Sequence, residues 1–183
     1  MGILLDLIAA PFALRRLAAA RRAVADVTPL VQDCGRLCRG ACCQADESGE
    51  NGMLLFPFEE RLYRKPIQDF PFALKPDDTL CKGGFRLVCQ GHCPREHRPL
   101  ACRIFPLRVR VSVDDQRGEP CVAAEIDPRA WALCPLPEAG GMRAMRAEFA
   151  DAVAEAGRHM CSNTFLLEAL LNEQRMLDES RTL

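Results

Sequence analysis

Cysteine is the residue type that gives this chain its chemistry. Eleven of the 183 residues are cysteines, and most of them stand in two dense groups beside glycine, arginine and proline, which is not the composition of a packed core. Thiolates gathered in this way are ligands for zinc and for iron–sulfur clusters. The sequence therefore predicts a cysteine-ligated metal site, whose candidate ligands are Cys34, Cys38, Cys42, Cys43, Cys89, Cys93, Cys102 and Cys134.

The spacing of these cysteines bears on the kind of metal. No two cysteines in the chain have the two-residue gap of a zinc knuckle or zinc ribbon. Irregular spacing and basic surroundings suit an iron–sulfur cluster, so a [4Fe–4S]-type cluster is slightly favoured over zinc as the cofactor. Eight thiols exceed the needs of one four-ligand site, which leaves two alternatives: two centres, or one centre with spare cysteines.

Arginine is concentrated around the second cysteine group, CQGHCPREHRPLACRIFP. Arg98 and Arg103 flank Cys102, and we expect them beside the cofactor, where a guanidinium lowers thiol pKa values and offsets the negative charge of thiolate ligands. Arg108 and Arg110 alternate outward on a predicted strand, so a solvated basic face and a place near the metal are equally good interpretations for them. His92 and His97 are weaker ligand candidates, since a single histidine is more often a surface or hydrogen-bonded residue.

Two further cysteines have plainer interpretations. Cys161 stands alone near the C-terminal end and is expected to pack as a small apolar residue. For Cys121, inside a predicted strand, packing and a functional role are equally good interpretations.

Composition and charge indicate the compartment and exclude some partners. The N-terminus has no basic residue ahead of its apolar stretch, and Asp6 interrupts that stretch, so it does not resemble a secretion signal. We therefore expect a cytoplasmic protein, in which reduced thiols bind metal rather than form disulfides. A net charge of −1 gives no field that would recruit nucleic acid. The expected partners are a metal ion or cluster and, as an alternative, a protein. Contact of the N-terminal helix with a membrane surface is the less favoured interpretation.

Hydrophobic periodicity predicts the first elements. We expect a helix over 3–25, interrupted at Pro11, and a strand over 53–56 followed by a short helix that starts at Pro57. Residues 44–52 and the proline-containing stretch 65–78 are expected to be loops. A second strand is predicted over 85–89.

Alternation of apolar and polar residues is clearest over 107–113, which predicts a strand that pairs with 121–126 across a turn at 114–120. Asp127 and Pro128 favour the start of a short helix that ends at Cys134. Two packing helices should follow, one from Met142 to near Gly157 and another from near Asn163.

These elements predict an α+β fold with a small antiparallel sheet, a loop-rich cysteine metal site, an N-terminal helix and a C-terminal helical pair. The length suits one compact unit. Within it we distinguish an N-terminal amphipathic helix at 1–33, a cysteine-cluster metal-binding domain at 34–135 and the helical pair at 136–183.

Four segments of the chain resemble a known family. The cysteines at 34–43 followed by LFPFEE at 55–60, and then CxxxCP at 89–94 and RPLACRIFP at 98–106, are similar to the YkgJ-type cysteine-cluster family, which is described as a zinc- or iron-chelating domain. Its RPxxCRxFP signature is matched residue for residue, whereas its CxxCxxCC signature has three residues in both inner gaps here. The resemblance spans about residues 34–135 and implies a cysteine-ligated metal centre.

The same resemblance opens an enzymatic alternative. One relative, flagellin lysine N-methylase, carries a similar cysteine domain associated with an iron–sulfur cluster, which implies a protein-modifying or redox enzyme. The sequence contains no glycine-rich nucleotide loop, no HExxH and no Ser-His-Asp signature. The function expected from the residues is therefore metal binding. The alternatives are such an enzyme, a structural zinc protein or a thiol-redox module.

Overall fold

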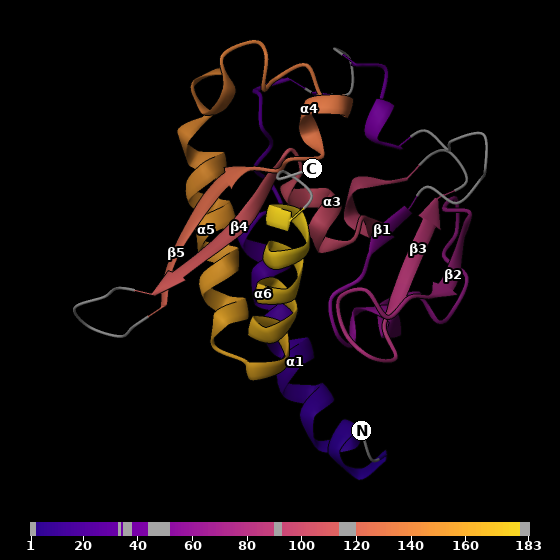
Figure 1. Cartoon of the computed structure of the whole chain (residues 1–183). Coiled ribbons are helices and arrows are strands. Elements are labelled where there is room, and N and C mark those ends of the chain that lie inside the picture. The colour runs from indigo at the N-terminus through magenta and orange to yellow at the C-terminus, as the bar shows by residue number, and fades with distance from the viewer. Residues whose placement is uncertain are drawn as a thin grey trace.

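The computed structural model describes residues 3–32, 34, 38–43, 52–89, 93–113 and 120–179, apart from the side chains of residues 3–8 and 43. It confirms the predicted α+β class, with an N-terminal helix, two small antiparallel sheets and C-terminal helices (Figure 1). The predicted loop at 44–52 and turn at 114–120 lie almost wholly outside the described residues.

The elements have the following bounds. The helices are α1 (Ile3–Ala23), α3 (Leu100–Ile104), α4 (Ala130–Leu133), α5 (Ala147–Cys161) and α6 (Thr164–Glu179). The strands are β1 (Gly52–Leu54), β2 (Phe72–Pro76), β3 (Phe85–Cys89), β4 (Leu107–Val113) and β5 (Pro120–Ile126). Short 3-10 helices cover Ala41–Cys43, Glu59–Tyr63, Arg95–His97 and Gly141–Ala144.

The main hydrophobic core lies between α1, α5, α6 and the β4–β5 hairpin. α1 lies along α5 (Figure 1). It contributes one stripe of buried residues spaced three and four apart, the pattern of a helix with one apolar face. That stripe is Ala10, Ala13, Leu17, Ala20 and Val24. No helix in the described part of the chain is long and apolar enough to cross a membrane.

The predicted interruption of the first helix at Pro11 is wrong, because α1 continues through this residue. Pro11 is on the exposed side of the helix, whereas its neighbours Ala10 and Ala13 are fully buried. Packing of the buried side therefore maintains the helix across a residue that removes one main-chain hydrogen bond.

The predicted end of the next helix at Gly157 is also wrong. α5 starts later and runs past Gly157 to Cys161. A Cβ atom at Gly157 would lie 2.6 Å from Cγ1 of both Val109 and Val122, so the glycine allows α5 to approach the hairpin closely. The start of the last helix is confirmed, because the Asn163 side chain accepts a hydrogen bond from the Leu166 N–H at 3.2 Å.

The second sheet has the strand order β1-β3-β2, with all strands antiparallel. Its strands β1 and β3 were predicted, but β2 lies within the stretch expected to be loop. Pro71 precedes β2 and Pro76 ends it, so both prolines stand where an edge strand tolerates them. This sheet packs over a smaller apolar cluster that includes Leu55, Tyr63 and Phe70.

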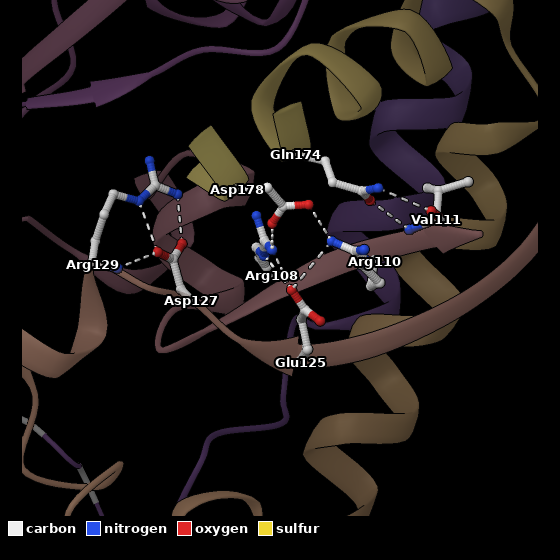
Figure 2. A network of polar contacts seen from close by, with 8 residues as sticks. All are labelled: Arg108, Arg110, Val111, Glu125, Asp127, Arg129, Gln174 and Asp178. Carbon is white, nitrogen blue, oxygen red and sulfur yellow. Dashed lines mark hydrogen bonds and ion pairs between the residues drawn. The ribbon is translucent and has the colours of Figure 1, made fainter. Parts of the chain in front are cut away.

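The β4–β5 hairpin carries charged residues on the face opposite α5, and α6 covers them (Figure 2). Arg108 is only 1% exposed. It donates to Glu125 at 2.6 Å and to Asp178 at 2.7 Å, and Arg110 donates to the second oxygen of Asp178 at 2.6 Å. Of the two interpretations of Arg108, the solvated basic face is therefore wrong, since the C-terminal helix α6 covers this residue.

α6 also satisfies the edge of β4 that does not pair with β5. The Gln174 side chain accepts from the Val111 N–H at 3.0 Å and donates to the Val111 carbonyl at 3.2 Å (Figure 2). One amide thus takes the place of a neighbouring strand along an otherwise open edge.

Candidate metal centre

Among the residues that the structure describes, four of the predicted ligands line one pocket. Cys42, Cys89, Cys93 and Cys102 share a cavity of about 100 Å³. Three apolar side chains complete much of its wall, namely Met53, Phe105 and Leu133. The charged residues of the lining are Arg98 and Arg129. The pocket therefore combines soft donors, an apolar wall and positive charge.

The four cysteines come from separate segments. Cys89 is the last residue of β3, and the buried Cys93 stands between β3 and the 3-10 helix at 95–97. Cys102 lies within α3, whereas Cys42 lies in the 3-10 helix at 41–43. Folding alone brings the second cysteine group and a member of the first group to one place.

A buried carboxylate fixes the helix that carries Cys102. Glu59 is fully buried, and its Oε1 accepts from the Leu100 N–H at 2.8 Å at the start of α3. The same oxygen accepts from Arg21 of α1 at 3.1 Å, and Oε2 accepts from the Phe56 N–H at 3.3 Å. Burial raises the pKa of the Glu59 carboxyl, although Arg21 opposes the shift. Glu59 therefore joins the LFPFEE and RPLACRIFP segments, which carry the family resemblance.

Tyr63 and Arg21 hold the chain just before α3. The Tyr63 hydroxyl donates to the His97 carbonyl at 2.8 Å, and Arg21 donates to the Arg98 carbonyl at 2.8 Å. Burial, with a smaller effect from the charge of Glu59, raises the pKa of the Tyr63 hydroxyl. The hydroxyl therefore remains a proton donor at neutral pH.

Arg103 is directed at main-chain carbonyls. It donates to the Glu96 carbonyl at 2.5 Å and to the Arg98 carbonyl at 3.0 Å, and it is not part of the pocket lining. Burial, together with the charge of Arg21, lowers the pKa of its guanidinium. Arg103 therefore holds the segment before Cys102, and the prediction that it stands beside a cofactor stays a prediction.

Two arginines do line the pocket. Arg98, which was predicted there, donates to the Cys93 carbonyl at 3.3 Å. Arg129, which was not, precedes α4 and is bound by Asp127 and Glu173. The sequence held one signal for it, since Asp127 was expected to start a helix at this point and its carboxylate accepts the Arg129 N–H at 2.8 Å. The contribution of Glu173 from α6 could not be foreseen.

Cys34, Cys38 and Cys134, three other predicted ligands, are not among the described residues of this pocket lining. Cys38 donates its thiol to the Cys34 carbonyl at a sulfur–oxygen distance of 3.9 Å. Burial raises the pKa of Cys134, and the charge of nearby Cys38 adds to the shift, whereas the Leu136 N–H opposes it. Cys38 and Cys134 are therefore neighbours. Cys43 ends the 3-10 helix at 41–43, and its side chain is outside the described residues.

The remaining candidates are more dispersed. Cys161 packs against the main core, as predicted, and Cys121 is exposed in β5. Cys81 stands between β2 and β3, where burial and nearby carboxylates raise its pKa. The His97 ring stacks on Phe70 with 6.4 Å between centroids. His92 is outside the described residues.

The thiol donors of the pocket are of the type that a thiophilic metal prefers, but, among the described residues, these donors are too far apart to hold a metal ion together. Within the described ranges, no three cysteine, histidine, aspartate or glutamate side chains lie close enough together to hold a metal ion. The four thiols of the pocket are nonetheless the donor type that zinc and iron–sulfur clusters use, and the two arginines complement the charge of thiolates.

Comparison of the chain with protein families, with curated proteins and with solved structures finds no match.

Proposed function

We propose that the protein binds a metal centre through Cys42, Cys89, Cys93 and Cys102, with a [4Fe–4S] cluster favoured over zinc. The observation that carries the proposal is that four cysteines from four segments line one pocket. Four thiolates are the usual ligand number for a [4Fe–4S] cluster and for structural zinc. A bound cluster would supply electron transfer, whereas zinc would supply a constraint on the fold.

The protein's own residues would then have distinct tasks. Arg98 and Arg129 offset the negative charge of the thiolates, which supports a cluster because its thiolate-ligated core is anionic. Met53 and Phe105 limit the access of water to the pocket. Glu59 holds α3, and with it Cys102, in register with the other donors.

The resemblance to the YkgJ-type family belongs to the same proposal. Its two signatures supply Cys42 and Cys102 to the pocket, and the intervening LFPFEE segment supplies Glu59, which binds the start of α3. These contacts give a structural reason for the two signatures to occur together in one chain. The nearby pair Cys38 and Cys134 is not needed for a four-ligand centre.

Anaerobic purification followed by iron, zinc and acid-labile sulfide analysis tests the proposal. Equivalent iron and sulfide with broad visible absorption would identify a cluster, and zinc without sulfide would identify the alternative metal. A chain that retains neither metal after anaerobic purification would refute the proposed function.

Matched serine variants locate the centre. C93S and C102S are expected to lose most of the bound metal, because each removes one thiolate from the pocket. C121S and C161S, at an exposed strand position and at the core margin, should retain wild-type metal content. Equal losses in all four variants would contradict the assignment of ligands. Removal of the metal from wild type with a chelator should also lower its unfolding temperature.

A further inference from the structure

Arg129 lies between the cysteine pocket, which it lines, and Glu173 of α6, to which it donates a hydrogen bond. Arg129 is one of the residues that line the pocket with the four cysteines. Its Nε donates to Asp127 at 2.9 Å and its Nη2 donates to Asp127 at 2.5 Å and to Glu173 at 2.8 Å. Figure 2 shows the Asp127 carboxylate facing the Arg129 guanidinium.

The two carboxylates that bind Arg129 are themselves buried. Asp127 is 1% exposed and Glu173 is 5% exposed. Asp127 is also fixed through its main chain, because its N–H donates to the Pro106 carbonyl at 2.9 Å, just after α3 and Phe105 of the pocket wall. Burying two carboxylates is unfavourable unless a cation satisfies them, and a guanidinium bound on three donors has little freedom to turn away.

We propose that Arg129 is a fixed cation that stabilises the thiolate-ligated centre, and that Asp127 and Glu173 are the positioning residues that hold its guanidinium at the pocket. The inference rests on the proposed function. Asp127 directly follows the hairpin, whereas Glu173 lies on α6. The position of the Arg129 guanidinium therefore depends on the packing of α6 against the rest of the fold.

Arg129 differs from the other arginines near the site. Arg103 donates to main-chain carbonyls and does not line the pocket. Arg110, on β4, pairs with Asp178 of α6 and does not line the pocket either. R110Q is therefore a matched control: it removes an arginine–carboxylate pair between the hairpin and α6 without changing the charge at the cysteines.

The test compares full-length protein as purified with metal bound, using the rate at which EDTA removes the metal. R129Q should release metal about tenfold faster than wild type, as expected when one unit charge is lost from a partly buried site. R129K keeps the charge and should recover most of the difference, and R110Q should resemble wild type.

E173Q separates a charge effect from a packing effect. Glutamine preserves the shape of the side chain and an oxygen acceptor for Arg129. Burial raises the pKa of the Glu173 carboxyl and the charge of Arg129 opposes this shift, so the substitution removes the negative charge that Arg129 maintains there. The proposal therefore predicts slower metal release in E173Q, opposite to R129Q. For a centre that contains iron, R129Q should also lower the reduction potential and E173Q should raise it. A tenfold change in the reduction equilibrium is about 59 mV for one electron.

The outcomes are distinguishable. Wild-type protein without metal would overturn the proposed function itself. Metal-loaded wild type and R129Q with equal release rates would overturn only the role of Arg129. Faster release in both R129Q and E173Q would show that the contacts serve packing, which also overturns the inference. If R129Q does not fold, the direction of the E173Q effect decides the question alone.

Discussion

Replacing Glu59 with alanine should destabilise the fold more than any exposed substitution. The change removes the acceptor of two buried N–H groups, those of Leu100 and Phe56, and the partner of Arg21. Each buried donor left without a partner costs about 1–3 kcal/mol. Arg21 keeps its hydrogen bond to the Arg98 carbonyl in this variant, so the Arg21 side chain loses only some of its polar contacts.

The free energy of unfolding should fall by about 3 kcal/mol in E59A. Two unsatisfied donors would cost roughly 6 kcal/mol at the upper limit, but the variant also removes the cost of burying a carboxylate. For a chain of this size the unfolding temperature should fall by about 6–12 °C. E59Q retains one oxygen, which serves Leu100 and Arg21, and should lose only about 1–2 kcal/mol.

Chemical denaturation followed by circular dichroism, at equal metal loading, measures both losses. E155A is the matched control, because the side chains of Glu155 and its partner Arg158 are both about half exposed and such surface pairs contribute about 1 kcal/mol or less. The reasoning would be refuted if E59A lost less than about 1 kcal/mol, or if E59Q were as damaging as E59A.

The pH dependence of Glu59 has a definite sign. Burial raises its folded pKa above the usual value of 4.5, so the folded chain binds this proton more tightly than the unfolded chain does. Its contribution is most favourable below about pH 4.5 and decreases as pH rises through the folded pKa. The stability of wild type minus that of E59Q should therefore decline over this range, and a rising difference would contradict the burial of an ionisable group here.

Three further predictions concern packing and charge. G157A should destabilise the protein by about 1–2 kcal/mol despite the better helix propensity of alanine, because the new methyl group meets Val109 and Val122, and V122A should relieve part of this loss in a double variant. D178N should lower stability above about pH 3.8 but not in strong acid, because two arginines hold the Asp178 pKa below its usual range and their stabilisation disappears as pH falls through the folded pKa; acid titrations of both proteins check this. Y63F should lose about 1 kcal/mol through one hydrogen bond to a main-chain carbonyl, as measured by urea unfolding.

Local pattern was enough for the elements with a strong period or a clear cap. The alternation over 107–113 predicted β4 and its pairing with β5, and Asn163 predicted the start of α6. Both signals depend on residues close together in sequence. β2 was missed because its prolines indicated a loop, whereas the strand depends on pairing with β3.

The chemistry of the candidate site divides in the same way. Residue types and clustering predicted thiol ligands and Arg98, since both depend only on the side chains that the chain contains. The sequence alone could not say which cysteines share a pocket, because Cys42 and Cys102 belong to distant segments and the helix that carries Cys102 is bound by Glu59 from a third segment.

The amino-acid sequence by itself determined the α+β class, the hairpin, the terminal helices and the thiol-rich character of the site. The tertiary structure decided which four cysteines share a pocket, that Arg108 is buried, that Gly157 is a contact point, and that Arg129 stands beside the thiols. The physical reason is that each of these depends on a surface supplied by a distant segment. α6 covers the arginines of β4 and supplies Glu173, and no local pattern along either segment records that contact.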